Sequence, residues 1–77
     1  MDANLDHLTH RARITGPVPY RSGSGRLLNI PIGPCLVEGL GSPCVDVIWG
    51  TRGQSSVALT VAEILSARDH GHLVLLD

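Results

Sequence analysis

The sequence contains no lysine and no phenylalanine, and tryptophan and tyrosine occur once each. All six basic side chains are arginine and the formal net charge is −1, which excludes a uniformly basic surface that binds nucleic acid by bulk electrostatics. With so few aromatic rings, a core of Val, Leu and Ile must be filled without large side chains. This shortage of buried area in a small chain favours self-association.

Long apolar runs are also absent. No segment reaches the roughly 18–20 apolar residues that span a bilayer, which excludes a transmembrane helix. The first ten residues, MDANLDHLTH, hold two acids and no apolar block, so no signal peptide is visible and we expect a cytoplasmic protein. The 77 residues allow one domain, and an apolar share of 43% is that of a folded chain.

The charges divide the chain into two parts. Residues 1–26 carry four arginines and two aspartates, a net charge of +2, whereas residues 27–77 carry two arginines and five acids, a net charge of −3. The first part also contains GPVPY and RSGSGR, which are typical of turns and linkers. We therefore predict a mobile or loosely docked arm over residues 1–25 and a folded body over residues 26–77.

The body is predicted to be mainly β. Apolar residues alternate over residues 27–32, and Pro31 places this strand at an edge or a bulge. A second short strand is predicted over residues 35–38, before a turn at residues 39–43 that is rich in glycine and ends in proline.

The clearest alternation lies over residues 44–49. It places Val45, Val47 and Trp49 on one face of a strand that is buried on one side. A further strand is predicted over residues 55–59, after a short connecting loop.

One helix is expected before the last strand. Thr60 and Glu63 fit a capping box, in which each side chain accepts a hydrogen bond from a free backbone N–H. Gly71 is placed to end the helix in a left-handed conformation, and residues 72–76 form the final strand. Four or five short strands with this helix predict a small closed or half-closed barrel of the SH3- or OB-like type.

The two cysteines flank the turn, so their relation depends on the register of the hairpin. A two-residue turn places Cys35 opposite Cys44 at disulfide distance, but it puts Pro43, which has no N–H, inside the ladder. A five-residue loop pairs Glu38 with Cys44 and keeps the thiols apart. A cytosolic setting favours two free and mostly buried thiols, with a disulfide and a metal or catalytic role as the alternatives.

The histidines form two close pairs in the sequence, His7 with His10 and His70 with His72. Each pair could bind one side of a metal ion. A structural zinc site, however, needs four ligands at particular spacings, and neither CxxC nor HxxxH is present. We interpret the histidines as solvated side chains in the arm and at the helix end, and predict no metal and no cofactor.

The loop over residues 50–54 is the first candidate for a binding site. Its two glycines could turn backbone N–H groups toward an anion, and Arg52 adds a positive charge. A phosphate-binding loop normally leads into a helix, whereas this loop leads into a strand, so a hairpin connection with an exposed arginine is favoured. The candidate partner-binding residues are Trp49, Arg52 and Gln54 here, and Arg11 and Arg13 in the arm.

No Ser/His/Asp or Cys/His arrangement identifies a nucleophile with its base, so no catalytic residue is predicted. We expect a non-enzymatic binding module that acts through contacts with proteins, including its own copies. The alternative is a nucleic-acid-binding barrel that uses the arginines of the arm and the Gly50–Gln54 loop, although Tyr20 alone offers no platform for stacking bases. A third hypothesis is an enzyme whose site forms at an oligomer axis from Trp49, Arg52 and Gln54.

Six short segments of the body follow one another in a particular order. They are Leu27-Leu28-Asn29-Ile30-Pro31, Leu36-Val37-Glu38, Val45-Asp46-Val47, Thr51-Arg52-Gly53, Val57-Ala58-Leu59 and Gly71-His72-Leu73-Val74-Leu75. This order, which covers residues 27–76, resembles the small hydrogenase-assembly chaperones of the HypC/HupF type. That family has a Cys-Leu-x-Ile-Pro opening, a Val-Glu strand, a V-D-V strand, a Gly-Arg turn, a V-x-L strand and a late Gly-x-x-Val-Leu strand.

The resemblance implies an OB-like barrel used for protein contacts. In the family, a cysteine exposed at the mature N-terminus binds the iron-bearing intermediate and the partner. Leu27 occupies the matching position here, and neither Cys35 nor Cys44 does. The resemblance therefore implies an assembly or chaperone-like role, and it does not extend to the family's iron-binding cysteine.

Overall fold

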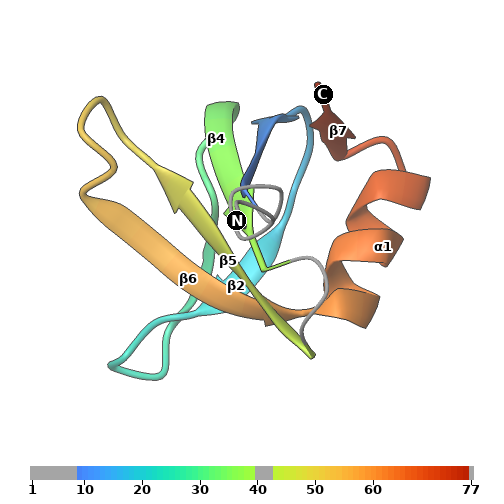
Figure 1. The fold of residues 1–77 in the computed structure, drawn as a ribbon. Helices are drawn as coiled ribbons and strands as arrows, with labels where there is room; N and C mark the ends of the chain where they lie inside the picture. The colour runs from blue at the N-terminus through green and yellow to red at the C-terminus, as the bar shows by residue number, and fades with distance from the viewer. Residues whose placement is uncertain (1–8, 40–42, 77) are drawn as a thin grey trace.

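The computed structural model describes residues 9–39 and 43–76, and this part of the chain contains seven strands and one helix (Figure 1). In chain order they are β1 (Thr9–Ile14), β2 (Pro19–Arg21), β3 (Leu27–Asn29), β4 (Gly33–Glu38), β5 (Cys44–Trp49), β6 (Ser55–Thr60), α1 (Val61–Asp69) and β7 (Leu73–Leu75). The prediction of a mainly β chain with one helix before the last strand is confirmed.

Five strands form one antiparallel sheet in the order β6-β5-β4-β1-β7, and β2 and β3 form a separate two-stranded sheet. The first and last strands of the chain are therefore neighbours, because β1 lies between β4 and β7. β6 and β7 are the two edges of the larger sheet. Within residues 9–39 and 43–76 its strands do not close into a continuous hydrogen-bonded ring, so the closed form of the predicted barrel is not seen.

Residues 9–25, which the sequence assigned to an arm, belong to the fold. β1 pairs with β4 over all six of its residues and with β7 over its last three. Ala12 and Ile14 are only 1% and 0% exposed, so β1 supplies part of the core. The arm prediction is therefore wrong for residues 9–25, and residues 1–8 lie outside the described part. The two arginines of β1 face solvent while its other face is buried, as the two-residue period of a strand requires.

The predicted strand over residues 27–32 is shorter than expected and lies in the small sheet. β3 ends at Asn29 and pairs with β2. Proline supplies no backbone donor, and the chain leaves the small sheet before Pro31. Ile30 then turns inward, where its N–H donates to the carbonyl oxygen of Val18 at 3.0 Å. This segment ties the small sheet to the core.

The strands predicted around residues 35–38, 44–49 and 55–59 are confirmed as β4, β5 and β6, with boundaries that differ by two residues at most. Along β5, Val45 and Val47 are fully buried and Trp49 is half-buried, which confirms the predicted inner face. All three strands are consecutive and antiparallel, so the sheet here is a simple meander.

The predicted capping box begins α1. The N–H of Glu63 donates to Oγ1 of Thr60 at 3.1 Å, and the N–H of Thr60 donates to Oε1 of Glu63 at 2.9 Å. Gly71 has φ +76°, as predicted for the residue that ends the helix. Among the described residues, no helix is long and apolar enough to cross a membrane.

The core lies between the larger sheet, the small sheet and α1. The helix contacts β5, β6 and β7, and it connects the two edge strands of the sheet along one side of the molecule (Figure 1). Ile64 points from the helix into the core and is 1% exposed. The buried side chains are Ala12, Ile14, Val18, Ile30, Cys35, Val37, Val45, Val47, Leu59, Ile64 and Leu73.

Candidate functional site

Side chains on the outer face of the five-stranded sheet, the face away from the core, form a row across four strands. The register places Arg11 opposite Leu36, Leu36 opposite Ile48, and Ile48 opposite Ser56. Residues directly opposite each other on antiparallel strands project from the same face. Leu36 is 39% exposed, and Leu76, whose N–H donates to the carbonyl oxygen of Arg11 at 2.8 Å, is 53% exposed. An apolar strip beside an arginine therefore faces solvent.

The loop between β5 and β6 turns this strip into a groove. A hollow of about 560 Å³ is bounded by β1, β4 and β5 and by residues 50–53. A Cβ atom added at Gly53 would lie 3.3 Å from Cγ2 of Ile48, so the loop passes close to Ile48. We call this hollow the outer groove, and it is lined by Arg11, Pro34, Leu36, Ile48, Arg52 and Leu76 among others. Among the described residues, its two charged lining residues are both arginine.

The loop itself is braced by its own hydrogen bonds. The N–H of Arg52 donates to Oε1 of Gln54 at 3.0 Å, and the N–H of Gly53 donates to the carbonyl oxygen of Gly50 at 3.0 Å. Two of the backbone donors that an anion would need are therefore used within the loop. β5 and β6 pair directly on either side of it, so the favoured interpretation as a hairpin connection with an exposed arginine is confirmed.

Three of the five candidate residues meet at the outer groove. Trp49 and Arg52 line it from β5 and the loop, and Arg11 lines it from β1. Gln54 instead braces the loop, and its side chain lies against Gly50, where an added Cβ would be 2.6 Å from Oε1. Arg13 is exposed on β1, opposite Pro34 on β4 and Val74 on β7, and it does not line the groove.

Trp49 also has a structural role. Its ring and that of Tyr20 have centroids 5.7 Å apart and planes tilted by 58°. The two aromatic side chains come from different sheets, β5 of the larger one and β2 of the smaller one. Both pack against the core, so this pair joins the two sheets on their core side.

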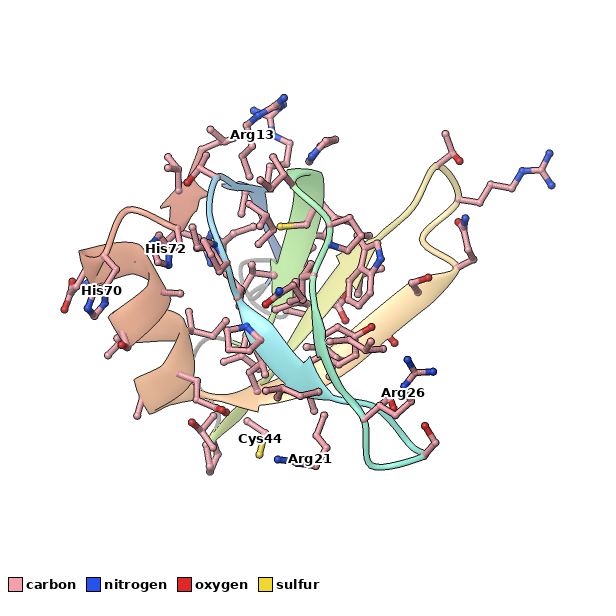
Figure 2. All side chains as sticks on the ribbon, turned by 180° about the vertical axis from the view of Figure 1, so that it is seen from behind. Arg13, Arg21, Arg26, Cys44, His70 and His72 are labelled. Carbon is pink, nitrogen blue, oxygen red and sulfur yellow. The ribbon has the colours of Figure 1, made fainter. Side chains whose placement is uncertain are left out.

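The arginines of the predicted arm do not form one basic surface. Figure 2 shows Arg13 at one end of the molecule and Arg21 and Arg26 at the opposite end. Nη1 of Arg21 donates to the carbonyl oxygen of Gly25 at 2.8 Å, which holds this side chain against its own hairpin. The fold thus separates charges that are close in the sequence.

Neither predicted register of the cysteine hairpin is observed. Cys35 lies opposite Trp49, and the last pair of the ladder before the turn is Glu38 with Asp46. Pro43 lies outside the ladder, as its missing N–H requires. Both thiols are free, as predicted, but Cys44 is exposed and only Cys35 is buried. Burial raises the pKa of the Cys35 thiol, which keeps it protonated and unreactive. The turn residues 40–42 lie outside the described part.

A second hollow lies on the opposite flank, between α1 and the segment Pro17–Pro19. It has a volume of about 460 Å³, and His70, His72, Glu63 and Ser66 supply its polar lining. The prediction of solvated histidines at the helix end holds for His70, which is exposed, whereas His72 is half-buried. Within residues 9–39 and 43–76, no three His, Cys, Asp or Glu side chains lie close enough to hold a metal together, and His7 lies outside this part.

Sequence reasoning missed the apolar residues of the outer groove. Leu36, Ile48 and Leu76 fall within strands that the sequence predicts, but the sequence selects none of them as a binding residue. The signal was present for Leu36 and Ile48, because both stand at strand positions next to buried ones, whereas Leu76 follows the end of β7. An apolar residue on the outward side of several neighbouring strands indicates an exposed patch once the register is known.

Comparison of the whole chain with protein-family models, with curated proteins and with solved structures found no match.

Proposed function

We propose that this chain is a non-enzymatic binding module that holds a protein partner in the outer groove. The observation that carries the proposal is the strip of partly exposed aliphatic side chains, Leu36, Ile48 and Leu76, on the floor of a groove with arginine at its border. A contiguous apolar patch rimmed by polar groups is typical of a protein-interaction surface. The strands beneath it are paired on both sides, which gives a rigid platform.

The charges of the groove favour a particular kind of partner segment. Arg11 and Arg52 are its only charged lining residues, and no carboxylate lines it within the described part of the chain. The guanidinium group of Arg52 has no hydrogen-bond or ion-pair partner among the described residues. A segment with aliphatic side chains beside an aspartate or glutamate complements both features.

Two further parts of the proposal concern the fold and the role. The hairpin β2–β3 lies between β1 and β4 in the chain, and β7 returns after α1 to pair with β1. This order supports a half-closed barrel that is SH3-like.

An assembly or chaperone-like role, as the resemblance to the HypC/HupF type implies, agrees with a module built for protein contacts. Leu27, at the position of that family's cysteine, lies on β3 and is 65% exposed.

The proposal is tested by crosslinking in the native host. A photoreactive amino acid is placed at Leu36 in one variant and at Leu27 in another, so that both sites are exposed but only the first lies in the outer groove. We expect one defined protein to be crosslinked from position 36 and not from position 27. Crosslinking from position 27 alone, or from neither position, would remove the groove as the binding surface.

Self-association is proposed to use the edge of β6. Its six residues, Ser55 to Thr60, include no charge and no proline, the features that normally protect an edge strand from pairing with another chain. Two copies related by a twofold axis can pair their β6 strands antiparallel, which would continue the sheet across the dimer. Ser56 and Ala58 face outward and are exposed, so they can be changed without touching the core.

Replacing Ser56 and Ala58 together by lysine is expected to shift the dimer to monomer. In the twofold arrangement, each of these outward side chains lies opposite the same position, or the other of the two positions, in the second copy. Like charges directly opposite each other destabilise strand pairing. Light scattering after size-exclusion chromatography over a range of concentrations measures the shift, which we expect to be at least tenfold in dissociation constant. Lysines at Ser24, in the turn between β2 and β3, and at Asn29, at the end of β3, are both exposed, add the same charge and should leave the dimer intact. A wild-type chain that stays monomeric at every concentration contradicts the proposed self-association through β6.

Nucleic acid binding is the second candidate function, and it is favoured because the charged residues that line the outer groove in the described part of the chain are both arginine. On this function, binding of a single-stranded oligonucleotide weakens with salt by about 0.7 log units per log unit of salt for each phosphate contact. Arg52→Ala is then expected to reduce the slope of the logarithm of the binding constant against the logarithm of the salt concentration by the value of about one phosphate contact. Arg68→Ala on α1 should leave this slope unchanged. Fluorescence anisotropy at several salt concentrations is the measurement. Binding that ignores salt, or no binding at low salt, ends this candidate.

A further inference from the structure

The end of α1 brings two imidazole rings together. His70 is the C-cap of the helix, His72 begins the return to β7, and Gly71 between them has φ +76°. The ring centroids lie 5.8 Å apart, with the planes tilted by 35°. Figure 2 shows the two labelled side chains beside each other at the end of the helix. Both line the hollow between α1 and Pro17–Pro19.

Each ring is oriented by a backbone carbonyl group. Nδ1 of His70 lies 2.7 Å from the carbonyl oxygen of Ser66, and Nδ1 of His72 lies 3.0 Å from that of Pro17. A carbonyl oxygen only accepts hydrogen bonds, so Nδ1 must carry the proton in both rings. In the neutral side chains the lone pair is therefore on Nε2. Metal-binding histidines in proteins are commonly prepared in this way, with one ring nitrogen donating to a carbonyl group and the other free to ligate.

His72 has little freedom to leave this position. The N–H groups of Thr15 and Gly16 both donate to its carbonyl oxygen, at 2.8 and 3.3 Å. Its ring lies directly against Gly16, where any side chain would collide with the imidazole. The hydroxyl of Thr15 donates to the carbonyl oxygen of Gly71, which fixes the turn between the two histidines. The site is thus partly ordered before any ligand arrives.

The spacing of the rings suits one metal ion. Two imidazoles that bind zinc through nitrogen at about 2.0–2.1 Å in a tetrahedral arrangement have ring centroids roughly 5 Å apart. The observed centroid distance of 5.8 Å is close to this value. Glu63 lines the same hollow, and its negative charge favours a cation over an anion there.

We propose that His70 and His72 form a two-histidine site for a divalent transition-metal ion of the class that prefers imidazole, namely zinc, nickel or copper. Within the described residues no third side chain completes the set, so water fills the remaining positions. The site is on the opposite flank from the outer groove and does not depend on the proposed function. Ligation uses the Nε2 lone pair of both rings.

The test is a titration of the full chain with zinc chloride and with nickel chloride at pH 7.5. Calorimetry measures the affinity and the number of ions bound, and nuclear magnetic resonance records the side-chain nitrogen resonances of the histidines. We expect one ion per chain and selective shifts of Nε2 in His70 and His72. His70→Ala should weaken binding at least tenfold, while His10→Ala and Cys44→Ser, which remove other potential ligands, should leave it unchanged. Magnesium should not bind, since it prefers oxygen ligands.

A second variant tests the positioning of His72 without removing a ligand. Gly16→Ala places a methyl group against the ring of His72, so zinc binding should weaken although both imidazoles remain. Circular dichroism checks that Gly16→Ala is folded. If it is not, His70→Ala, a change at an exposed position, tests the metal site instead. Zinc binding of unchanged affinity in His70→Ala, Nε2 resonances that do not shift, or an absence of binding overturns the proposal.

Discussion

Replacing Ile14 by alanine is expected to lower the free energy of unfolding by about 2–5 kcal/mol. The side chain is fully buried in β1, which lies between β4 and β7 in the sheet. Alanine removes most of its buried apolar surface and leaves a cavity among residues that are paired on both sides. For a domain of this size such a loss is a large fraction of the total stability. Urea denaturation followed by circular dichroism measures it.

Arg13→Ala is the matched control, because Arg13 is the neighbouring residue of the same strand and faces solvent. A surface substitution of this kind should change the free energy of unfolding by less than about 0.5 kcal/mol. A mobile arm would give small effects at both positions. An Ile14→Ala chain as stable as the wild type would therefore show that β1 is not part of the folded core.

Leu36→Asp is expected to weaken binding of the crosslinked partner at least tenfold, a loss of about 1.4 kcal/mol or more. Leu36 lies at the centre of the cross-strand row, between Arg11 and Ile48. Aspartate removes an apolar contact from the groove floor and adds a negative charge where the partner's own carboxylate is expected. Calorimetry or surface plasmon resonance with the purified partner gives the dissociation constant.

The effect on folding should be much smaller than the effect on binding. Leu36 is exposed on the outer face, and strand preferences differ by only about 1 kcal/mol between residue types. Leu27→Asp makes the same change at a more exposed position on β3 and should bind the partner with wild-type affinity. If both variants lose binding equally, the outer groove is not the contact surface.

The parts of the fold that local patterns describe were predictable. The alternation around Val45 and Val47 predicted β5, and the spacing of Thr60 and Glu63 predicted the start of α1. Gly71 was predicted to end that helix, because glycine readily adopts the left-handed backbone conformation that ends a helix. Each of these features depends on residues that are neighbours in the chain.

β1 was missed although its pattern was present. Ala12 and Ile14 alternate with arginines, but two apolar side chains are a weak signal beside four positive charges and a run of glycine and serine. What makes this segment a strand is pairing with β4 and β7, the second of which is near the other end of the chain. Such long-range pairing is not encoded in any short window of sequence.

The candidate site was predictable only in part for the same reason. Arg52 in the loop and Trp49 just before it stand out in the sequence, because the loop is rich in glycine and the chain has a single tryptophan. The floor of the outer groove, in contrast, depends on the register that places Leu36 opposite Ile48. A shift of the hairpin by one residue would turn these side chains to the other face. The cysteine hairpin illustrates this point, since neither predicted register is the observed one.

The most direct test of the central claim is a map of the partner's contact surface by nuclear magnetic resonance. The isotope-labelled chain is titrated with the purified partner, and the shift of every backbone amide is recorded. The account predicts that the largest shifts fall on β1, β4, β5 and residues 50–53, around Leu36 and Ile48. Shifts confined to α1 and Pro17–Pro19, or to the β2–β3 hairpin, would contradict it.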